Sequence, residues 1–233
     1  MKNNKRVLLK LSGETLSGNG NSVCAESLQM IVDEIKSILS DKVELSIVVG
    51  AGNIWRGAGK EIDRVSADKM GMLATVINAL AISESLKSNG IKSVALSACG
   101  VSGFCETFSQ AKADKYLKEG YVVVFGGGTG NPFFTTDTTA ALRASEIKAD
   151  IILKATQVDG VYTADPKKDK TATKYDKISY TEAINKNLKI MDLSAFLLCM
   201  ENNIEIYVFD FHKKGNLKKV LDGENIGTLI TTA

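Results

Sequence analysis

Short uninterrupted apolar runs recur along the chain and constrain its fold more than any other feature of the sequence. Most are hydrophobic throughout instead of alternating with polar residues, which is typical of strands buried on both faces of a sheet. The runs are residues 7–11, 45–49, 93–96, 121–125, 151–153, 204–209 and 228–230. Between them, residues 27–39 and 70–86 repeat apolar side chains at helical spacing. Because strands alternate with helices, we predict an α/β protein in which helices cover a mostly parallel sheet.

The composition is that of an ordinary globular protein. The chain has 233 residues, of which 44% are hydrophobic and 24% are charged, and its net charge is +2. No repeat, low-complexity tract or linker divides it, so we expect a single domain that spans residues 1–233. The nearly balanced charge gives no reason to expect a nucleic acid or a membrane surface as a partner.

The first residues resemble the beginning of a signal peptide, but Lys10 and the polar residues 12–14 end the apolar run too early for an export signal. No stretch approaches the roughly 18 apolar residues of a membrane span. Four scattered cysteines without a Cys-x-x-Cys pair are typical of reduced thiols. Together these features predict a cytoplasmic protein.

His212 is the only histidine, and it lies in a polar segment that we expect on the surface. A thiolate–imidazole metal site is therefore disfavoured, and so is Ser-His-Asp or Cys-His catalysis. The chemistry of this chain must come from carboxylates, lysines, hydroxyls and backbone amides.

Four predicted strands end in small or polar residues, at 10–14, 50–57, 126–137 and 154–160. In a parallel sheet such loops converge at the carboxyl edge, where ligands bind. The third segment contains four glycines, which allow backbone N–H groups to approach a ligand closely and so favour a phosphate. The chain has neither a Walker A motif nor Gly-x-Gly-x-x-Gly after its first strand. We therefore predict a phosphate site of another design.

Lys10 interrupts an otherwise apolar strand. It can be an edge-strand lysine that points to water, or a ligand for phosphate. The Ser12-Gly13 pair that follows favours phosphate, because an ammonium group beside backbone amides suits nucleotide oxygens. Lys154 repeats this design at another strand end, with Thr156 after it. Two lysines at one sheet edge can neutralise the charge on a migrating phosphoryl group.

Two further charged residues have two interpretations each. Arg56 can be an exposed loop arginine, but its glycine-rich surroundings favour a bidentate contact with phosphate. Asp137 precedes the helical residues 138–143, so it is expected to cap that helix. Its carboxylate can at the same time orient either of the two lysines.

The adjacent Phe133 and Phe134 can belong to the core. Because Asn131, Thr135 and Thr136 surround them, they can equally frame a flat base whose edge is bound by hydroxyls and amides.

Several motifs resemble those of the bacterial uridylate kinases (UMP kinases), a branch of the amino-acid-kinase superfamily. They are residues 10–14, 52–53, 56–59, 68–75, 129–137, 154–156, 158–166 and 191–193. The resemblance covers essentially the full length, and the run from 129 to 137 is specific to this branch.

The resemblance implies a three-layer αβα sandwich around a mostly parallel eight-stranded sheet, and a homohexamer. It also implies transfer of the γ-phosphoryl group of MgATP to UMP, which gives UDP and ADP in pyrimidine nucleotide biosynthesis. Mg²⁺ is expected to be held mainly through the ATP phosphates, so no residue is assigned as a metal ligand.

The family pattern also implies roles for individual residues. The residues implied to bind ATP are Lys10, Leu11, Ser12, Gly13, Gly52, Arg56, Thr156, Tyr162 and Asp165. Those implied to bind UMP are Ala51, Asp68, Thr129, Gly130, Asn131, Pro132, Phe133, Phe134, Thr135 and Thr136. Those implied to support the transfer itself are Lys10, Asp137 and Lys154.

Two segments depart from the family pattern. Family members often carry three glycines before the asparagine, whereas Ala51 adds a methyl group here. Residues 18–23 lack the phenylalanine that GTP-responsive relatives usually carry in a Gly-Phe-Gly element.

Two other functions fit the same residues. One is a related small-molecule kinase that acts on a carboxylate or carbamate and shares the ATP half of the site. The other is a non-catalytic protein that stores a nucleotide or an oxyanion on the same fold, against which Lys10, Asp137 and Asp165 argue.

Overall fold

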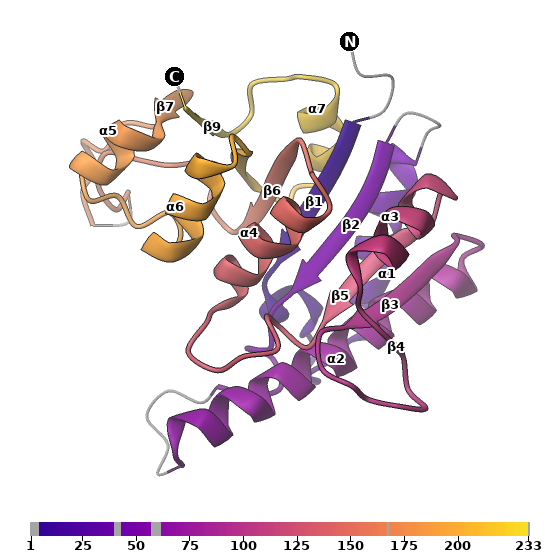
Figure 1. Ribbon diagram of the computed structural model, residues 1–233. Coiled ribbons are helices and arrows are strands. Elements are labelled where there is room, and N and C mark those ends of the chain that lie inside the picture. The colour runs from indigo at the N-terminus through magenta and orange to yellow at the C-terminus, as the bar shows by residue number, and fades with distance from the viewer. Residues whose placement is uncertain (1–4, 40–42, 57–61, 167, 233) are drawn as a thin grey trace.

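The computed structural model describes residues 5–39, 43–56, 62–166 and 168–232, and these form one nine-stranded sheet between two layers of helices (Figure 1). The strand order is β4-β3-β5-β2-β1-β6-β8-β9-β7, and only β8 and β9 pair in antiparallel fashion. The strands are β1 (Lys5–Leu11), β2 (Val43–Val49), β3 (Ser93–Ser97), β4 (Glu106–Thr107), β5 (Val122–Gly126), β6 (Ile151–Thr156), β7 (Lys177–Ser179), β8 (Glu205–Asp210) and β9 (Thr228–Thr231).

The predicted α/β class, the mostly parallel sheet and the three layers are confirmed. Each of the seven apolar runs corresponds to a strand, although residues 121 and 204 precede β5 and β8 by one position. The described sheet has nine strands and not eight. The two strands that the sequence did not reveal, β4 and β7, have two and three residues and occupy the two edges of the sheet. An edge strand this short buries too few side chains to leave an apolar run.

Helices cover both faces of the sheet. The helices are η1 (Gly13–Leu16), α1 (Ala25–Ile38), α2 (Arg64–Ser88), α3 (Gln110–Lys118), α4 (Thr136–Glu146), α5 (Tyr180–Asn185), α6 (Leu193–Glu201) and α7 (Asn216–Leu221). Buried residues of α1, α2 and α7 pack on one face, and those of α3, α4, α5 and α6 pack on the other.

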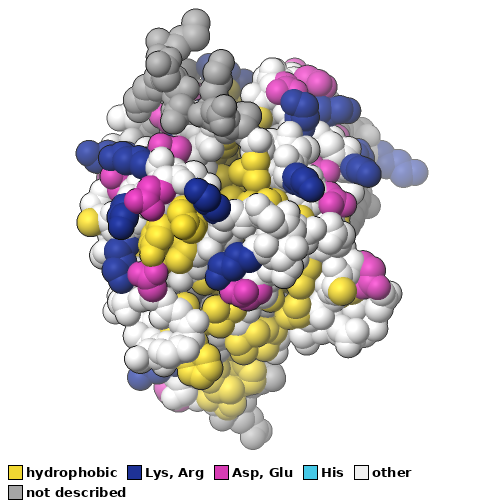
Figure 2. All heavy atoms as spheres, turned by 90° about the vertical axis from the view of Figure 1, so that its right-hand side faces the viewer, with side chains coloured by type: hydrophobic (Ala, Val, Ile, Leu, Met, Phe, Trp, Pro, Cys, Tyr) yellow, Lys and Arg dark blue, Asp and Glu magenta, His cyan; other side chains and the backbone are white. Residues whose placement is uncertain are grey.

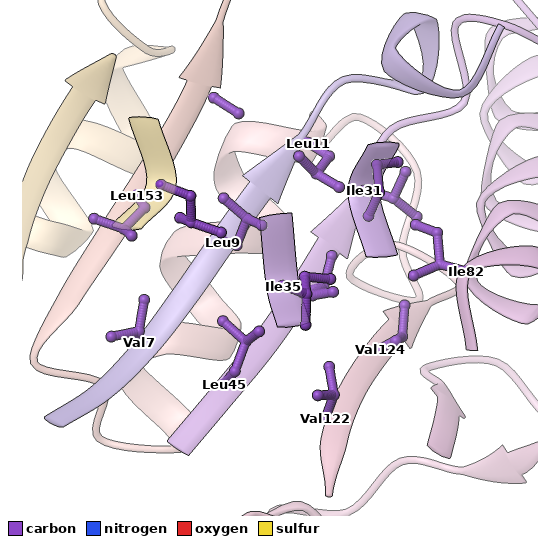
Figure 3. Packing of buried hydrophobic residues seen from close by; sticks show 14 of the residues in the cluster. Val7, Leu9, Leu11, Ile31, Ile35, Leu45, Ile82, Val122, Val124 and Leu153 are labelled. Atoms are coloured by element: carbon purple, nitrogen blue, oxygen red, sulfur yellow. The ribbon is translucent and has the colours of Figure 1, made fainter. Parts of the chain in front are cut away.

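Side chains of β1 alternate between the two halves of the core. Val7, Leu9 and Leu11 point toward α1, where they pack with Ile31 and neighbouring residues (Figure 3). Leu8 belongs to the opposite cluster, which includes α4. Because successive strand residues point to opposite faces, Lys10 shares the α4 side with Leu8.

Helix α2 is longer than the predicted segment 70–86, because it begins at Arg64 after its N-cap Asp63. It is also long and apolar enough to meet the length and composition criteria for a membrane span, contrary to the expectation that no segment would do so. Core helices meet the same criteria. Part of α2 packs against the sheet, whereas Met70, Leu73 and Ile77 are exposed on another side.

Candidate active site

Three charged side chains meet at the carboxyl edge of the sheet. Lys10 and Lys154 are paired in the register of the neighbouring strands β1 and β6. Asp137, in the first turn of α4, lies between their ammonium groups. Its Oδ1 is 3.0 Å from Nζ of Lys10, and its Oδ2 accepts a hydrogen bond of 2.8 Å from Nζ of Lys154. The structure thus brings together the three residues predicted to support phosphoryl transfer.

Both lysines are largely withdrawn from solvent, since their side chains are 12% exposed. Strand β1 lies in the middle of the sheet, so the interpretation of Lys10 as an edge-strand lysine is wrong. Lys154 also donates a hydrogen bond to the carbonyl of Ile190. Burial lowers the pKa of Lys154 below its ordinary value, and the ammonium of Lys10 lowers it further, although Asp137 opposes both effects.

Asp137 is not the N-cap of its helix, contrary to the sequence-based prediction. The cap is Thr135, whose hydroxyl accepts hydrogen bonds from the backbone N–H groups of Asp137 and Thr138. Thr135 in turn donates to the carboxylate of Asp192, the N-cap of α6. Burial raises the pKa of Asp192, but hydrogen bonds from Ser194 and Thr135 outweigh that effect and hold it below its ordinary value. The carboxylate of Asp137 therefore remains available to the lysines.

A cavity of about 330 Å³, here called the α2 cavity, lies between α2 and the loop that follows β5. Seven of the ten residues implied to bind UMP line it, and they are Ala51, Asp68, Asn131, Phe133, Phe134, Thr135 and Thr136. The other three, Thr129, Gly130 and Pro132, lie in the same loop but do not line the cavity.

The glycines of this loop are required by its conformation. Gly127 has φ +77, and a Cβ there would lie 2.8 Å from Oγ of Ser97. Phe133 has φ +74, and its backbone N–H donates a 2.7 Å hydrogen bond to Asp68 on α2. Phe133 and Phe134 are 56% and 53% exposed, so the interpretation of them as core residues is wrong. More than half of each side chain is therefore accessible to a ligand.

A second cavity of about 670 Å³, here called the β6 cavity, lies beyond the carboxyl end of β6. Three of the residues implied to bind ATP line it, namely Thr156, Tyr162 and Asp165, and so does Lys154. The hydroxyl of Tyr162 donates a 2.7 Å hydrogen bond to Asp159. Gly52 lines the α2 cavity instead.

The remaining residues implied to bind ATP line neither cavity. Lys10, Leu11, Ser12 and Gly13 form the end of β1 and the turn after it, and the side chain of Leu11 is fully buried. Only backbone groups of Leu11 can therefore face a ligand.

Arg56 lies against the loop after β2. Its guanidinium is hydrogen-bonded to the carbonyl of Gly52 at 3.0 Å and ion-paired with Glu14. It is 67% exposed, so a phosphate could displace Glu14 at small cost. Residues 57–59 of the same motif lie outside the described residues.

The model of the amino acid kinase family matches residues 5–210. The chain belongs to this family. Its structure superposes on that of the UMP kinase from Bacillus anthracis with a TM-score of 0.94 and 41% identity, over 98% of this chain and 96% of the other. The UMP kinase from Ureaplasma parvum gives 0.94 and 37%, over 98% and 99% of the two chains. The uridylate kinase from Archaeoglobus fulgidus gives 0.73 and 30%, over 97% and 99%.

Sequence reasoning missed several residues that line the cavities of this amino acid kinase. Arg64, in the first turn of α2, lies 3.7 Å from Asp68 and 5.0 Å from the ring centre of Phe133. Its spacing of four residues from Asp68 on a helix is a signal that could have identified it. The β6 cavity is also lined by residues 186–190, which carry no motif that the sequence reveals.

Asp137, the carboxylate between the two lysines, is not part of a metal-binding cluster of the described residues. In the described part of the chain, no group of three or more His, Cys, Asp or Glu side chains is arranged to hold one. Both carboxylate oxygens of Asp137 face lysines instead. Such a site suits a cation that arrives with nucleotide phosphates, since Mg²⁺ is commonly bound that way.

Proposed function

We propose that this chain is a UMP kinase that transfers the γ-phosphoryl group of MgATP to UMP and releases UDP and ADP. The observation that carries the proposal is the position of Asp137 between Lys10 and Lys154, next to lining residues of both cavities. Thr136, beside Asp137, lines the α2 cavity, and Lys154 lines the β6 cavity. The similarity to structures named UMP kinase over nearly the whole chain supports the same function.

The geometry suggests how the transfer proceeds. UMP occupies the α2 cavity, with its base near Phe133 and Phe134, and ATP occupies the β6 cavity. The transferred group then passes close to the two lysines, whose ammonium groups stabilise the negative charge on its oxygens. Asp137 fixes the position of both lysines, and the Mg²⁺ that accompanies ATP supplies further neutralisation of charge.

The first rival function is a related kinase for a carboxylate or carbamate, and the second is a nucleotide-storage protein. ADP release measured in a coupled assay with UMP, with CMP and with no acceptor distinguishes all three. A site that pairs its polar groups with uracil leaves them unpaired with cytosine, so we expect UMP to be preferred by a factor on the order of 10⁴ in kcat/KM. Equal values for UMP and CMP contradict the proposal. If neither UMP nor CMP supports ADP release, one of the rival functions is favoured.

The assembly and context of the enzyme belong to the same proposal. We propose a single-domain, cytoplasmic homohexamer that acts in pyrimidine nucleotide biosynthesis and has no nucleic-acid or membrane partner. The exposed side chains of Met70, Leu73 and Ile77 support an assembly, because they follow one another at helical spacing on α2. Figure 2 shows a band of hydrophobic side chains at the height that α2 occupies in Figure 1.

A further inference from the structure

Asn78 is a polar side chain on α2 that is fully buried yet has no assigned role. Its Nδ2 donates hydrogen bonds of 2.8 Å to the carbonyl of Gly50 and to Oδ1 of Asn53. Its Oδ1 accepts a third bond, of 3.0 Å, from Nδ2 of Asn53. A buried amide must be bonded somewhere. Here all three bonds go to one short segment, the glycine-rich turn after β2.

The bond to Gly50 fixes more than one carbonyl. No described peptide bond is cis, so the C=O of Gly50 and the N–H of Ala51 lie on opposite sides of one planar peptide. Because Asn78 holds the carbonyl, the N–H of Ala51 points to the side opposite Asn78. Ala51 and Gly52 both line the α2 cavity. An N–H group that can donate a hydrogen bond to phosphate is thus oriented by a side chain that touches no ligand.

The pair of amides also leaves the surrounding loops little freedom. A Cβ at Gly13 would lie 2.4 Å from Oδ1 of Asn53 and 2.7 Å from the backbone nitrogen of Gly52. Asn53 further donates a 2.6 Å bond to the carbonyl of Ser22. Asn78 therefore ties the turn after β2, through Asn53, to the turn after β1 and to the segment before α1.

Thr75, one turn earlier on α2, acts on the loop after β5 in the same way. Its hydroxyl accepts a 2.9 Å hydrogen bond from the backbone N–H of Gly127. The buried side of α2 therefore contacts the beginnings of two loops that line the α2 cavity.

We propose that Asn78 is a positioning residue for phosphoryl transfer. Its side-chain amide orients the Gly50–Ala51 peptide so that the Ala51 N–H can bind the phosphate of the acceptor. This inference rests on the proposed function, because the acceptor is taken to be a nucleoside monophosphate. Asn78 itself touches neither substrate.

The test compares Asn78→Leu with Ser83→Ala. Leucine has the same number and branching of side-chain heavy atoms as asparagine but makes no hydrogen bond, so the peptide loses its anchor. Ser83 is also fully buried on α2, but its hydroxyl bonds to Ser93 on β3, away from the glycine-rich turn. We expect Asn78→Leu to lower kcat/KM for UMP by about 10- to 100-fold, because a small misplacement of a reacting group has an effect of that size. Ser83→Ala should stay within about twofold of the wild type, since it removes a hydrogen bond distant from the site.

A second variant keeps the test decisive if Asn78→Leu folds poorly. In Asn78→Asp the donor becomes a carboxylate oxygen that faces the carbonyl of Gly50, whereas the protonated carboxyl can still donate. Because position 78 is fully buried, the pKa of this carboxyl should lie well above its ordinary value of about 3.9. Its kcat/KM relative to wild type should therefore recover as the pH falls from 9 to 6, a pH profile that Ser83→Ala should not show. Wild-type kcat/KM in both variants at every pH overturns the proposal. The proposal is also overturned if Asn78→Leu and Ser83→Ala lose the same fraction of kcat/KM at an equal loss of Tm.

Crystal structures of the wild type and Asn78→Leu separate this inference from the proposed function. A rotated Gly50–Ala51 peptide in the variant supports the role of Asn78 even if UMP proves not to be the acceptor. An unrotated peptide overturns it even if the wild type phosphorylates UMP.

Discussion

Two lysines share one carboxylate in the candidate site, and substitutions of these residues test what each contributes. Lys10→Met keeps roughly the length of the side chain and removes its charge. Loss of one preorganised donor typically costs about 3–4 kcal/mol in the transition state, so we expect kcat to fall by about 10²–10³. Asp137→Asn keeps the shape but no longer holds the lysines by charge, and a fall in kcat of roughly 10- to 100-fold is expected.

Steady-state kinetics and direct titration with UMP distinguish these effects from binding. Affinity for UMP should change little in Asp137→Asn, because the carboxylate faces the lysines and not the α2 cavity. If Lys10→Met raises only the KM for ATP and keeps a normal kcat, Lys10 merely binds nucleotide. Lys154 is then the cation that stabilises the transition state.

The pH dependence of the reaction should report the burial of Lys154. Its pKa is lower in the folded protein than the ordinary value of 10.5, mainly because burial disfavours the charged form. The unfolded chain thus binds this proton more tightly, and the contribution of Lys154 to the free energy of unfolding rises with pH between the two pKa values. Over the same window the ammonium group loses its charge. We therefore expect kcat to decrease as the pH rises, beginning at pH values lower than 10.5. Lys154→Arg should move this limb to higher pH in a pH–rate profile. An unmoved limb assigns it to another group.

The candidate residues were predictable from the sequence to different degrees. Lys10 and Lys154 each interrupt an apolar strand, so the neighbouring sequence alone identifies them as unusual positions for a charge. Their contact with Asp137 depends on the register of β1 with β6, which pairs residues 144 positions apart, and no local pattern encodes it. Asn78 lies in an apolar helix, and nothing in the sequence distinguishes it from a surface residue.

At the scale of elements, the turn between β5 and α4 depends on a glycine that can be tested against a matched control. Gly127 and Gly120 both have φ +77, so alanine at either position should cost about 1–2 kcal/mol of unfolding free energy. A Cβ at Gly120 meets nothing within 4 Å, whereas one at Gly127 lies 2.9 Å from the backbone nitrogen of Ala98. Gly127→Ala should therefore cost about 1–3 kcal/mol more. Urea unfolding measures the difference, and equal losses would show that the loop relaxes freely.

The same scale shows what hydrophobic patterning can and cannot reveal. The central strands were predictable because both faces of each are buried, which makes the run apolar throughout. The beginning of α2 was not, since residues 64–69 are largely polar and only Ala67 among them is buried. That polar turn carries Arg64 and Asp68, both of which line the α2 cavity. These two lining residues thus lie where the hydrophobic signal of α2 is weakest.

For the whole molecule, the exposed side of α2 is the feature that a monomer explains least. Leu73 and Ile77 are 51% and 52% exposed and lie one turn apart. Contiguous apolar surface on a helix commonly marks an interface, and homo-oligomers are the commonest assemblies. The proposed homohexamer predicts a particle of about six chains of 25.0 kDa each.

Charge placed on this surface tests the assembly directly. Leu73→Glu puts a carboxylate where a neighbouring copy is expected to pack, and an unpaired buried charge typically costs about 3–5 kcal/mol. Ile184→Glu is the control, because Ile184 is 37% exposed but lies on α5, in the other helix layer. Light scattering after size-exclusion chromatography should give a native mass near six chains for the wild type and the control, and a smaller mass for Leu73→Glu. An unchanged mass in Leu73→Glu excludes α2 as the interface, since the substituted side chain would then remain in solvent. A monomeric wild type contradicts the assembly itself.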